Sequence, residues 1–427
     1  MMADNIEHVI SYWVIFQTFH SPLLGGFAVI SHWLPHLLFA FHIGGLADRL
    51  NSRKMILVAE AVFMVISIAW GALFLTHRLA IWHAMGLLAI HGLAGALWSP
   101  PTQLITHEIV GPQHLQSAVR LNATARQLGI LLGPAVGGTL MLVLGPAYGL
   151  MVNALLYLPL MVWLLTAPYT GLAARKALSR VQAHQGNLFQ EAIWVGRRVS
   201  GNSAIVTMIV LAGLSSLLIG NAFQAQMPQF AGDLGTDKSG FAYSALLAAN
   251  AAGAVLGGFV LELAAFSRAR QRTATILAIL WCVAIGGFAA APSYSIALTA
   301  LFLAGVFNIS FMAMCQTLVQ VEAPADIRGR VIGLFNMAQQ GLRVGSGLTV
   351  GVLGSLIGIH WSLGLSAAAL ASCSVALLAV APGALRRTQG RSNLAPTPQV
   401  AAERQVGQGE TPHHGRSEDP GGPGSRP

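Results

Sequence analysis

The chain has 427 residues, of which 54% are hydrophobic and 9% are charged, and its formal net charge is +9. A mean hydropathy of +0.63 excludes an ordinary soluble globular domain. The excess of Lys and Arg over Asp and Glu indicates loops that face anionic lipid rather than a protein that binds nucleic acid. Apolar runs near the 20 residues that cross a bilayer recur from end to end, and lipid requires every backbone group to be satisfied locally. We therefore expect an all-α polytopic membrane protein.

Twelve apolar segments follow one another along the chain. They cover residues 1–19, 22–46, 55–75, 79–104, 117–143, 147–167, 203–230, 240–265, 273–291, 294–320, 332–357 and 360–382. The expected domains are an N-terminal six-helix bundle over 1–167, a cytoplasmic linker over 168–202 with an amphipathic helix at 187–199, a C-terminal six-helix bundle over 203–382, and a disordered cytoplasmic tail over 383–427.

The basic residues predict the orientation of these segments. If the loop at 49–54 lies in the cytoplasm, every Lys and Arg except Arg78 and Lys238 falls on that side of the membrane. This bias follows the positive-inside rule. It predicts a multi-pass protein of the inner or plasma membrane with a cytoplasmic C-terminus.

The loop between the second and third segments clusters charge in a chain that has little. Asp48 can face a helix N-terminus, where the helix dipole favours an anion, and Asn51 tolerates the left-handed backbone of a tight turn. The stretch resembles the G-x-x-x-D-R-x-G-x-R-K loop of the major facilitator superfamily, with Asn51 in place of the second glycine. The matching residues are Gly44, Asp48, Arg49, Arg53 and Lys54. The alternative is an ordinary positive-inside hairpin of another polytopic protein.

An internal repeat supports the same resemblance. The triplet at 26–28 recurs at 240–242, and the Gln-x-Gly-x-x-x-Gly pattern of 127–133 recurs at 339–345, at nearly the same separation. A parallel repeat of two six-helix halves is what the superfamily fold implies, over about residues 1–385. By the same repeat the first helix is truncated at its N-terminus, so we expect the native chain to begin upstream of Met1 with a basic segment.

The fifth segment carries a second motif. Gly133-Pro134-Ala135-Val136-Gly137-Gly138 resembles the G-P-x-x-G-G signature of the superfamily's exporters. Proline bends the helix and glycine permits close crossing, so the alternative is a packing kink. In the fourth segment, His91 stands for the Gln of the R-x-x-Q-G motif of proton-coupled drug exporters, and the Arg is absent. The overall pattern is most similar to the siderophore-exporter and macrolide-efflux branch.

Polar residues inside the apolar segments are the candidate functional residues. An acid at a helix centre costs on the order of 3 kcal/mol, so Glu7 is expected to line a cavity and carry protons, with Asp4 and His8 beside it. The alternative for Glu7 is a hydrogen bond to a neighbouring helix. The superfamily's first, fourth, seventh and tenth helices line its cavity. The candidate substrate contacts are His36, His91, Asn221, Gln224, Asn250, Asn308, Gln316 and Asn336.

These observations predict a secondary transporter that works by alternating access and exports a small organic or amphipathic molecule by proton antiport. The alternatives are a nutrient or metabolite importer of the same fold, and a non-transporting sensor or degenerate paralogue. The expected partners are a small-molecule substrate, protons and membrane lipid, without nucleic acid, and the expected state is a monomer. The sequence shows no Walker-type loop, no metal-binding spacing among its His residues and no cofactor motif, so no enzyme, metal or cofactor is predicted.

Overall fold

The computed structural model describes residues 2–47, 50–170, 188–235, 240–263, 270–324 and 327–392. These residues form α- and π-helices, and none of them lies in a strand. Contacts divide the chain into a compact unit, Met1–Ala379, and a second unit, Val380–Pro427. The first unit holds every described helix except the C-terminal end of the last one.

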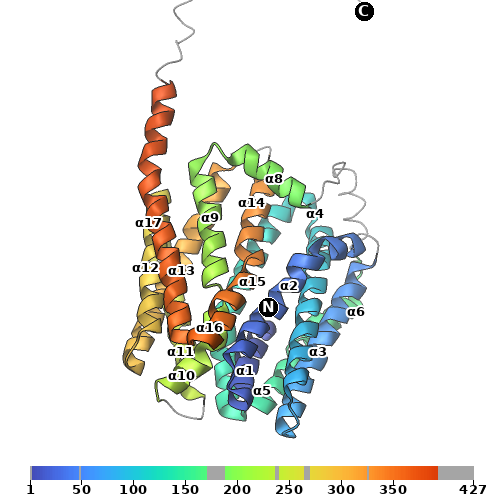
Figure 1. Ribbon diagram of the computed structural model, residues 1–427. Coiled ribbons are helices and arrows are strands. Elements are labelled where there is room, and N and C mark those ends of the chain that lie inside the picture. The colour runs from blue at the N-terminus through green and yellow to red at the C-terminus, as the bar shows by residue number, and fades with distance from the viewer. Residues whose placement is uncertain are drawn as a thin grey trace, which may run out of the picture. The chain divides into compact units, whose positions relative to one another are not determined.

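The helices follow one another with short connections (Figure 1). In the N-terminal part they are α1 (Met2–Phe19), α2 (Pro22–Ala47), α3 (Ser52–Leu75), α4 (Ile81–Leu144), α5 (Pro146–Leu155), α6 (Leu158–Thr166) and α8 (Leu188–Val199). In the C-terminal part they are α9 (Ser203–Leu218), α10 (Ala222–Asp233), α11 (Phe241–Leu263), α12 (Gln271–Ala289), α13 (Tyr294–Glu322), α14 (Arg328–Asn336), η1 (Met337–Gly341), α15 (Arg343–Ser346), η2 (Gly347–Val352), α16 (Leu353–Ile357) and α17 (Ile359–Ser392).

Nine stretches of the described residues are helical, long and apolar enough to cross a membrane, and Leu128–Leu144 is a shorter apolar helix. Many large apolar side chains on these helices are exposed, among them Val65, Phe259 and Val283. A lipid environment accounts for such a surface, since soluble monomers rarely expose wide apolar patches. The prediction of an all-α polytopic membrane protein is confirmed.

Glycine changes the chain direction at two places along these segments. The segments at 79–104 and 117–143 lie in α4, whose helical backbone is interrupted between them at Gly111, where φ is +68° and ψ is 172°. Glycine adopts this conformation readily because it has no Cβ. The segment at 203–230 is interrupted between α9 and α10, where Gly220 has a φ of +46°.

The loop that begins α3 differs in detail from the prediction. Asn51 has an extended backbone, not a left-handed one, and its side-chain oxygen accepts a hydrogen bond from the Lys54 amide, so Asn51 caps α3. The Arg53 Nη1 donates to the Ala167 carbonyl at 2.6 Å, which ties the start of α3 to the end of α6. Asp48 and Arg49 lie outside the described residues.

The C-terminal part of α17 also corrects a prediction. The helix continues to Ser392, so the residues from 383 to 392 are helical and the prediction of disorder is wrong there. The sequence Ala384-Leu385-Arg386-Arg387 explains this, because all three residue types favour helix. Residues 393–427 lie outside the described part of the chain.

Glycines allow close helix crossings in both parts of the chain. A Cβ added to Gly92 on α4 would lie 1.9 Å from the Ser31 carbonyl oxygen on α2. A Cβ on Gly305 of α13 would lie 2.0 Å from the Asn250 carbonyl oxygen on α11. The Asn250 side chain also donates to the Leu301 carbonyl at 3.1 Å. These crossings fix where α2, α4, α11 and α13 place their polar side chains.

The α11–α13 crossing gives a stability prediction. Gly305→Ala will lower the free energy of unfolding by about 2–3 kcal/mol, because its methyl group meets a backbone oxygen that cannot rotate away. Gly287→Ala on α12 is the matched control, since a Cβ there meets nothing within 4 Å. Thermal unfolding of the detergent-solubilised protein checks the prediction. Equal midpoints for the two variants would contradict it.

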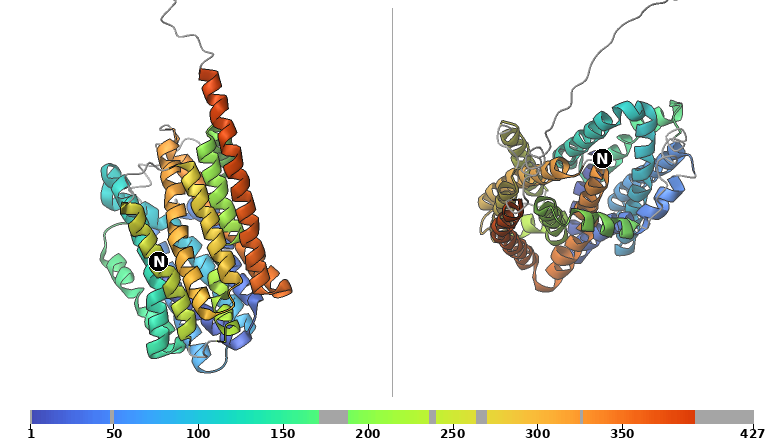
Figure 2. Two further views of the ribbon diagram at one scale, coloured as in Figure 1. Left: turned by 90° about the vertical axis from the view of Figure 1, so that its left-hand side faces the viewer. Right: turned by 90° about the horizontal axis from the view of Figure 1, so that it is seen from above.

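The N-terminal helices α1–α6 and the C-terminal helices α9–α17 meet at the end of the bundle opposite α8 (Figures 1 and 2). There the Tyr243 hydroxyl donates to the Val9 carbonyl at 3.0 Å, and the Gln226 side chain donates to the Pro22 carbonyl at 2.8 Å. At the same end a Cβ on Gly351 of η2 would lie 2.2 Å from the Cα of Gly26 on α2. We call this region the closed end.

Candidate functional site

A cavity of about 1360 Å³ lies between the N-terminal and C-terminal helices. Its walls continue along α4 to Thr106 and Asn122, which lie on either side of the kink at Gly111, and along α11 to Phe259. They therefore extend away from the closed end. A cavity of this size can hold a drug-sized organic molecule.

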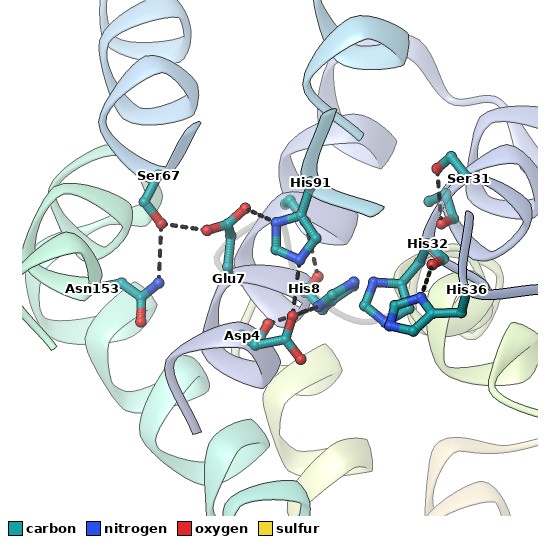
Figure 3. Close-up of polar contacts among 11 residues, drawn as sticks. Asp4, Glu7, His8, Ser31, His32, His36, Ser67, His91 and Asn153 are labelled. Atoms are coloured by element: carbon teal, nitrogen blue, oxygen red, sulfur yellow. Dashed lines mark hydrogen bonds and ion pairs between the residues drawn. The ribbon is translucent and has the colours of Figure 1, made fainter. Parts of the chain in front are cut away.

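His91 of α4 joins two carboxylates of α1 at the cavity wall (Figure 3). Its Nδ1 lies 2.8 Å from Oε1 of Glu7, and its Nε2 lies 2.8 Å from Oδ1 of Asp4. When both carboxylates are ionised they only accept hydrogen bonds, so both ring nitrogens of His91 then donate, as an imidazolium does. In that state two carboxylates and one imidazolium give this group a net charge of −1.

Glu7 lies behind the cavity wall rather than on it. Its side chain is 2% exposed, and its Oε2 accepts a hydrogen bond of 2.5 Å from the Ser67 hydroxyl of α3. The Asn153 amide of α5 donates in turn to Ser67 at 3.0 Å (Figure 3). The expectation that Glu7 lines the cavity is wrong, because these bonds satisfy its carboxylate inside the N-terminal helices. Nothing in the sequence marks Ser67 and Asn153 as its partners, since they come from other helices.

Three further histidines, His8, His32 and His36, lie beside Asp4 and His91. The His8 Nδ1 donates to the Asp4 carbonyl at 2.7 Å, and the His8 ring meets those of His32 and His91 edge-on, with centroids 4.7 and 4.9 Å apart. His36 lies one turn beyond His32 on α2 and donates from Nδ1 to the His32 carbonyl at 3.1 Å. One ligand atom from each of Asp4, His8, His32 and His91 lies within 4.8 Å of the others.

Most of the predicted substrate contacts line the cavity. Those that do so are His36, Asn221, Gln224, Asn250, Asn308 and Asn336. Gln316 is exposed on α13 and is not among the lining residues. His91 is 3% exposed and lies behind the wall, where it pairs with Asp4 and Glu7.

Two aromatic contacts on the wall involve charged residues. The Arg343 guanidinium of α15 lies 4.8 Å from the ring centroid of Trp33 on α2, a cation–π contact between the two sets of helices. The Trp98 indole donates to Oε1 of Glu60 at 2.7 Å. Neither pair is predicted from the sequence, because each joins separate helices.

The Gly/Pro motif of α4 packs against α1 and α11. A Cβ on Gly133 would lie 2.5 Å from Cβ of Asn5, and one on Gly137 would lie 3.3 Å from Cα of Ile6. A Cβ on Gly138 would lie 2.9 Å from Cβ of Ser244 on α11, and Pro134 lines the cavity. The motif thus holds α1, which carries Asp4 and Glu7, tightly against α4.

Comparison with known proteins shows the family of this chain. Residues 2–410 match the family described as transmembrane secretion effector. The enterobactin exporter EntS of Shigella boydii serotype 18 is 26% identical over 324 residues, which cover 74% of this chain and 73% of that protein. EntS of Escherichia coli O139:H28 matches to the same extent.

Solved structures share the fold. The nucleoside transporter NupG is 16% identical with a TM-score of 0.63, over 90% of this chain and 97% of that chain. A bacterial homologue of the human lysosomal transporter Spinster, in an inward-facing and unoccupied conformation, is 14% identical with a TM-score of 0.56, over 90% and 94% of the two chains. Because the family match spans nearly the whole chain, this protein belongs to the transmembrane secretion effector family of the major facilitator superfamily and is a multi-pass membrane transporter.

Proposed function

We propose that the protein exports a small organic molecule from the cytoplasm by alternating access, with twelve helices in two related halves and a cytoplasmic C-terminus. The observation that carries this proposal is the cavity, which holds about 1360 Å³ and is closed at one end by contacts between the two sets of helices. The bias of basic residues supports an orientation in which the cavity faces the cytoplasm. The EntS relatives support export and make a siderophore the first substrate to test.

The export is driven by protons, and the coupling group consists of Glu7, Asp4 and His8 together with His91. Asp4 lines the cavity with a side chain that is 20% exposed, whereas Glu7 is reached only through His91. A proton that enters an outward-open cavity neutralises the net negative charge of the Asp4–His91–Glu7 group. Opening to the cytoplasm then releases the proton as the substrate binds, which is antiport.

The polar wall suits a molecule that is partly apolar and carries several hydrogen-bonding groups. Amide side chains face the cavity from the C-terminal helices, and Trp33 and Phe223 give it aromatic surface. A few placed polar groups on an otherwise apolar wall are typical of small-molecule sites. The wall thus supports an amphipathic organic cargo.

Transport in proteoliposomes tests the proposal, with enterobactin as the first substrate and an imposed pH gradient. Glu7→Gln keeps the shape of the side chain but cannot ionise, so it will reduce gradient-driven transport at least tenfold and leave enterobactin binding measurable. Glu60→Gln is the matched control, because Glu60 lines the cavity but bonds Trp98 instead of His91.

Three outcomes would contradict parts of this proposal. Wild-type rates for Glu7→Gln would remove Glu7 from the coupling group. Transport that is unaffected when the pH gradient is collapsed would exclude proton coupling. Net movement into the cytoplasmic compartment would replace export by import.

A further inference from the structure

We propose that Asp4, His8, His32 and His91 bind one divalent transition-metal ion in the wall of the cavity. We call these four residues the histidine cluster. They come from three helices, α1, α2 and α4, and Figure 3 shows their side chains turned toward one another. The inference does not depend on the exported substrate or on proton coupling.

The spacing of the four side chains suits a four-coordinate ion. Each residue offers one ligand atom, and these atoms lie within 4.8 Å of one another. Metal–nitrogen bonds of about 2.0–2.1 Å in a tetrahedral site place neighbouring ligand atoms about 3.3 Å apart. Side-chain movements of about 1 Å therefore close the cluster around an ion.

The donor set selects the class of metal. Three imidazoles and one carboxylate suit Zn²⁺, Co²⁺, Ni²⁺ or Cu²⁺. Mg²⁺ and Ca²⁺ prefer sites made of oxygen ligands, so they are excluded as occupants. Zn²⁺ takes this mixture of ligands in tetrahedral geometry most readily.

A second observation points independently to a ligand. The Nδ1 atom of His32 is buried and has no hydrogen-bond partner, whereas buried polar atoms are nearly always paired. The His32 ring also lies against the rings of His8 and His91, with centroids 4.7 and 5.6 Å away. The three imidazoles are thus close enough for one shared cation to join them.

The surroundings orient two of the imidazoles as metal sites require. The Nδ1 of His91 bonds Glu7, which Ser67 holds in place, and the Nδ1 of His8 bonds the Asp4 carbonyl. The Nε2 of His8 can therefore turn toward an ion, and the Nε2 of His91 already faces Oδ1 of Asp4, a second ligand of the cluster. A histidine held by a carboxylate at its outer nitrogen is the usual partner arrangement around bound zinc.

Charge is balanced when the ion binds. The proton between Nε2 of His91 and Oδ1 of Asp4 leaves, because both atoms become ligands. The two charges of the ion are then matched by the carboxylates of Asp4 and Glu7. Asp4, His8 and His32 line the cavity, so the ion reaches the cluster from the cavity itself.

Equilibrium binding of Co²⁺ to the full-length purified protein tests the inference. The protein is prepared in detergent with a tag that lacks histidine and is stripped of metal by a chelator before Co²⁺ is added. We expect one Co²⁺ per chain with the visible absorption of a four-coordinate ion. Zn²⁺ will displace it, and Mg²⁺ at the same concentration will not.

Variants separate the cluster from other histidines. His32→Ala removes a ligand that makes no hydrogen bond through Nδ1, and it will weaken Co²⁺ binding at least tenfold. Asp4→Asn, which keeps the side-chain shape, is the second variant in case His32→Ala does not fold, and it will weaken Co²⁺ binding to a similar extent. His36→Gln is the control, because His36 lines the same cavity next to His32 but lies outside the cluster, and its affinity will stay within twofold of wild type.

Each contrary result would overturn the inference. The first is that the wild-type protein binds no four-coordinate Co²⁺. The second is that His32→Ala or Asp4→Asn binds Co²⁺ as tightly as wild type. The third is that His36→Gln loses as much affinity for Co²⁺ as His32→Ala. The binding assay involves no transport. A failure of enterobactin export therefore leaves the metal inference standing, and a failure to bind Co²⁺ leaves the proposed export standing.

Discussion

Replacing His91 by alanine will lower the free energy of unfolding by about 3–5 kcal/mol near neutral pH. The imidazole contacts Asp4 and Glu7 at 2.8 Å each, and Glu7 is 2% exposed. Its removal leaves the buried Glu7 carboxylate without its imidazole partner and with the Asp4 carboxylate nearby, which is the costly way to break a buried ion pair. Unfolding of the detergent-solubilised protein, followed as a function of pH, measures the effect.

The pH dependence distinguishes lost charge from lost packing. Because protonation removes the charge of a carboxylate, a deficit that comes from unpaired charge will shrink as the pH falls. His107→Ala is the control, because His107 lies on the same helix but takes no part in the contacts with Asp4 and Glu7, and it will change stability little. A His91→Ala deficit that is the same at all pH values would mean that the imidazole acts by filling space.

Gly351→Ala will shift the protein away from the conformation in which the closed end is sealed. A methyl group on Gly351 of η2 would lie 2.2 Å from Cα of Gly26 on α2, a contact of backbone against backbone. The two helices must separate there, so the closed end opens. A penalty of about 1.4 kcal/mol already changes the ratio of two conformations tenfold, and we expect at least that change.

A cysteine at the cavity wall reports this shift. Asn221→Cys lines the cavity and will react with a membrane-impermeant thiol reagent supplied at the closed end at least tenfold faster when Gly351→Ala is present. Gly258→Ala is the control, because a Cβ there meets nothing within 4 Å. Equal labelling rates with and without Gly351→Ala would show that this crossing does not hold the closed end.

The sequence predicts where helices lie better than how each one is shaped. Apolar length locates α2, α3, α11, α12 and α13 to within a few residues, because a bilayer dictates the length of a spanning segment. It does not reveal the break at Gly220, since a glycine within an apolar run reads equally well as a helix-packing residue.

The candidate site shows a similar limit. The acids of α1 are recognisable from the cost of placing charge among apolar residues, and the spacing of four between Asp4 and His8 puts them on one helix face. Their pairing with His91 is not recognisable, because it depends on how α1 and α4 cross. For that reason Glu7 is expected on the cavity wall but lies behind it, and the histidine cluster has no sequence motif.

The two π-helical stretches η1 and η2 have a mechanical consequence. A π-turn bonds each carbonyl to an amide five residues ahead, one more than an α-turn, and rewinding it as α-helix turns everything beyond it by about 100°. Arg343 lies two residues after the last residue of η1, and the glycines that touch Gly26 lie within η2. Rewinding of η1 can move the Arg343 guanidinium away from the Trp33 ring. Rewinding of η2 can break the contact of Gly351 with Gly26. Both changes are local and need no rearrangement of the other helices.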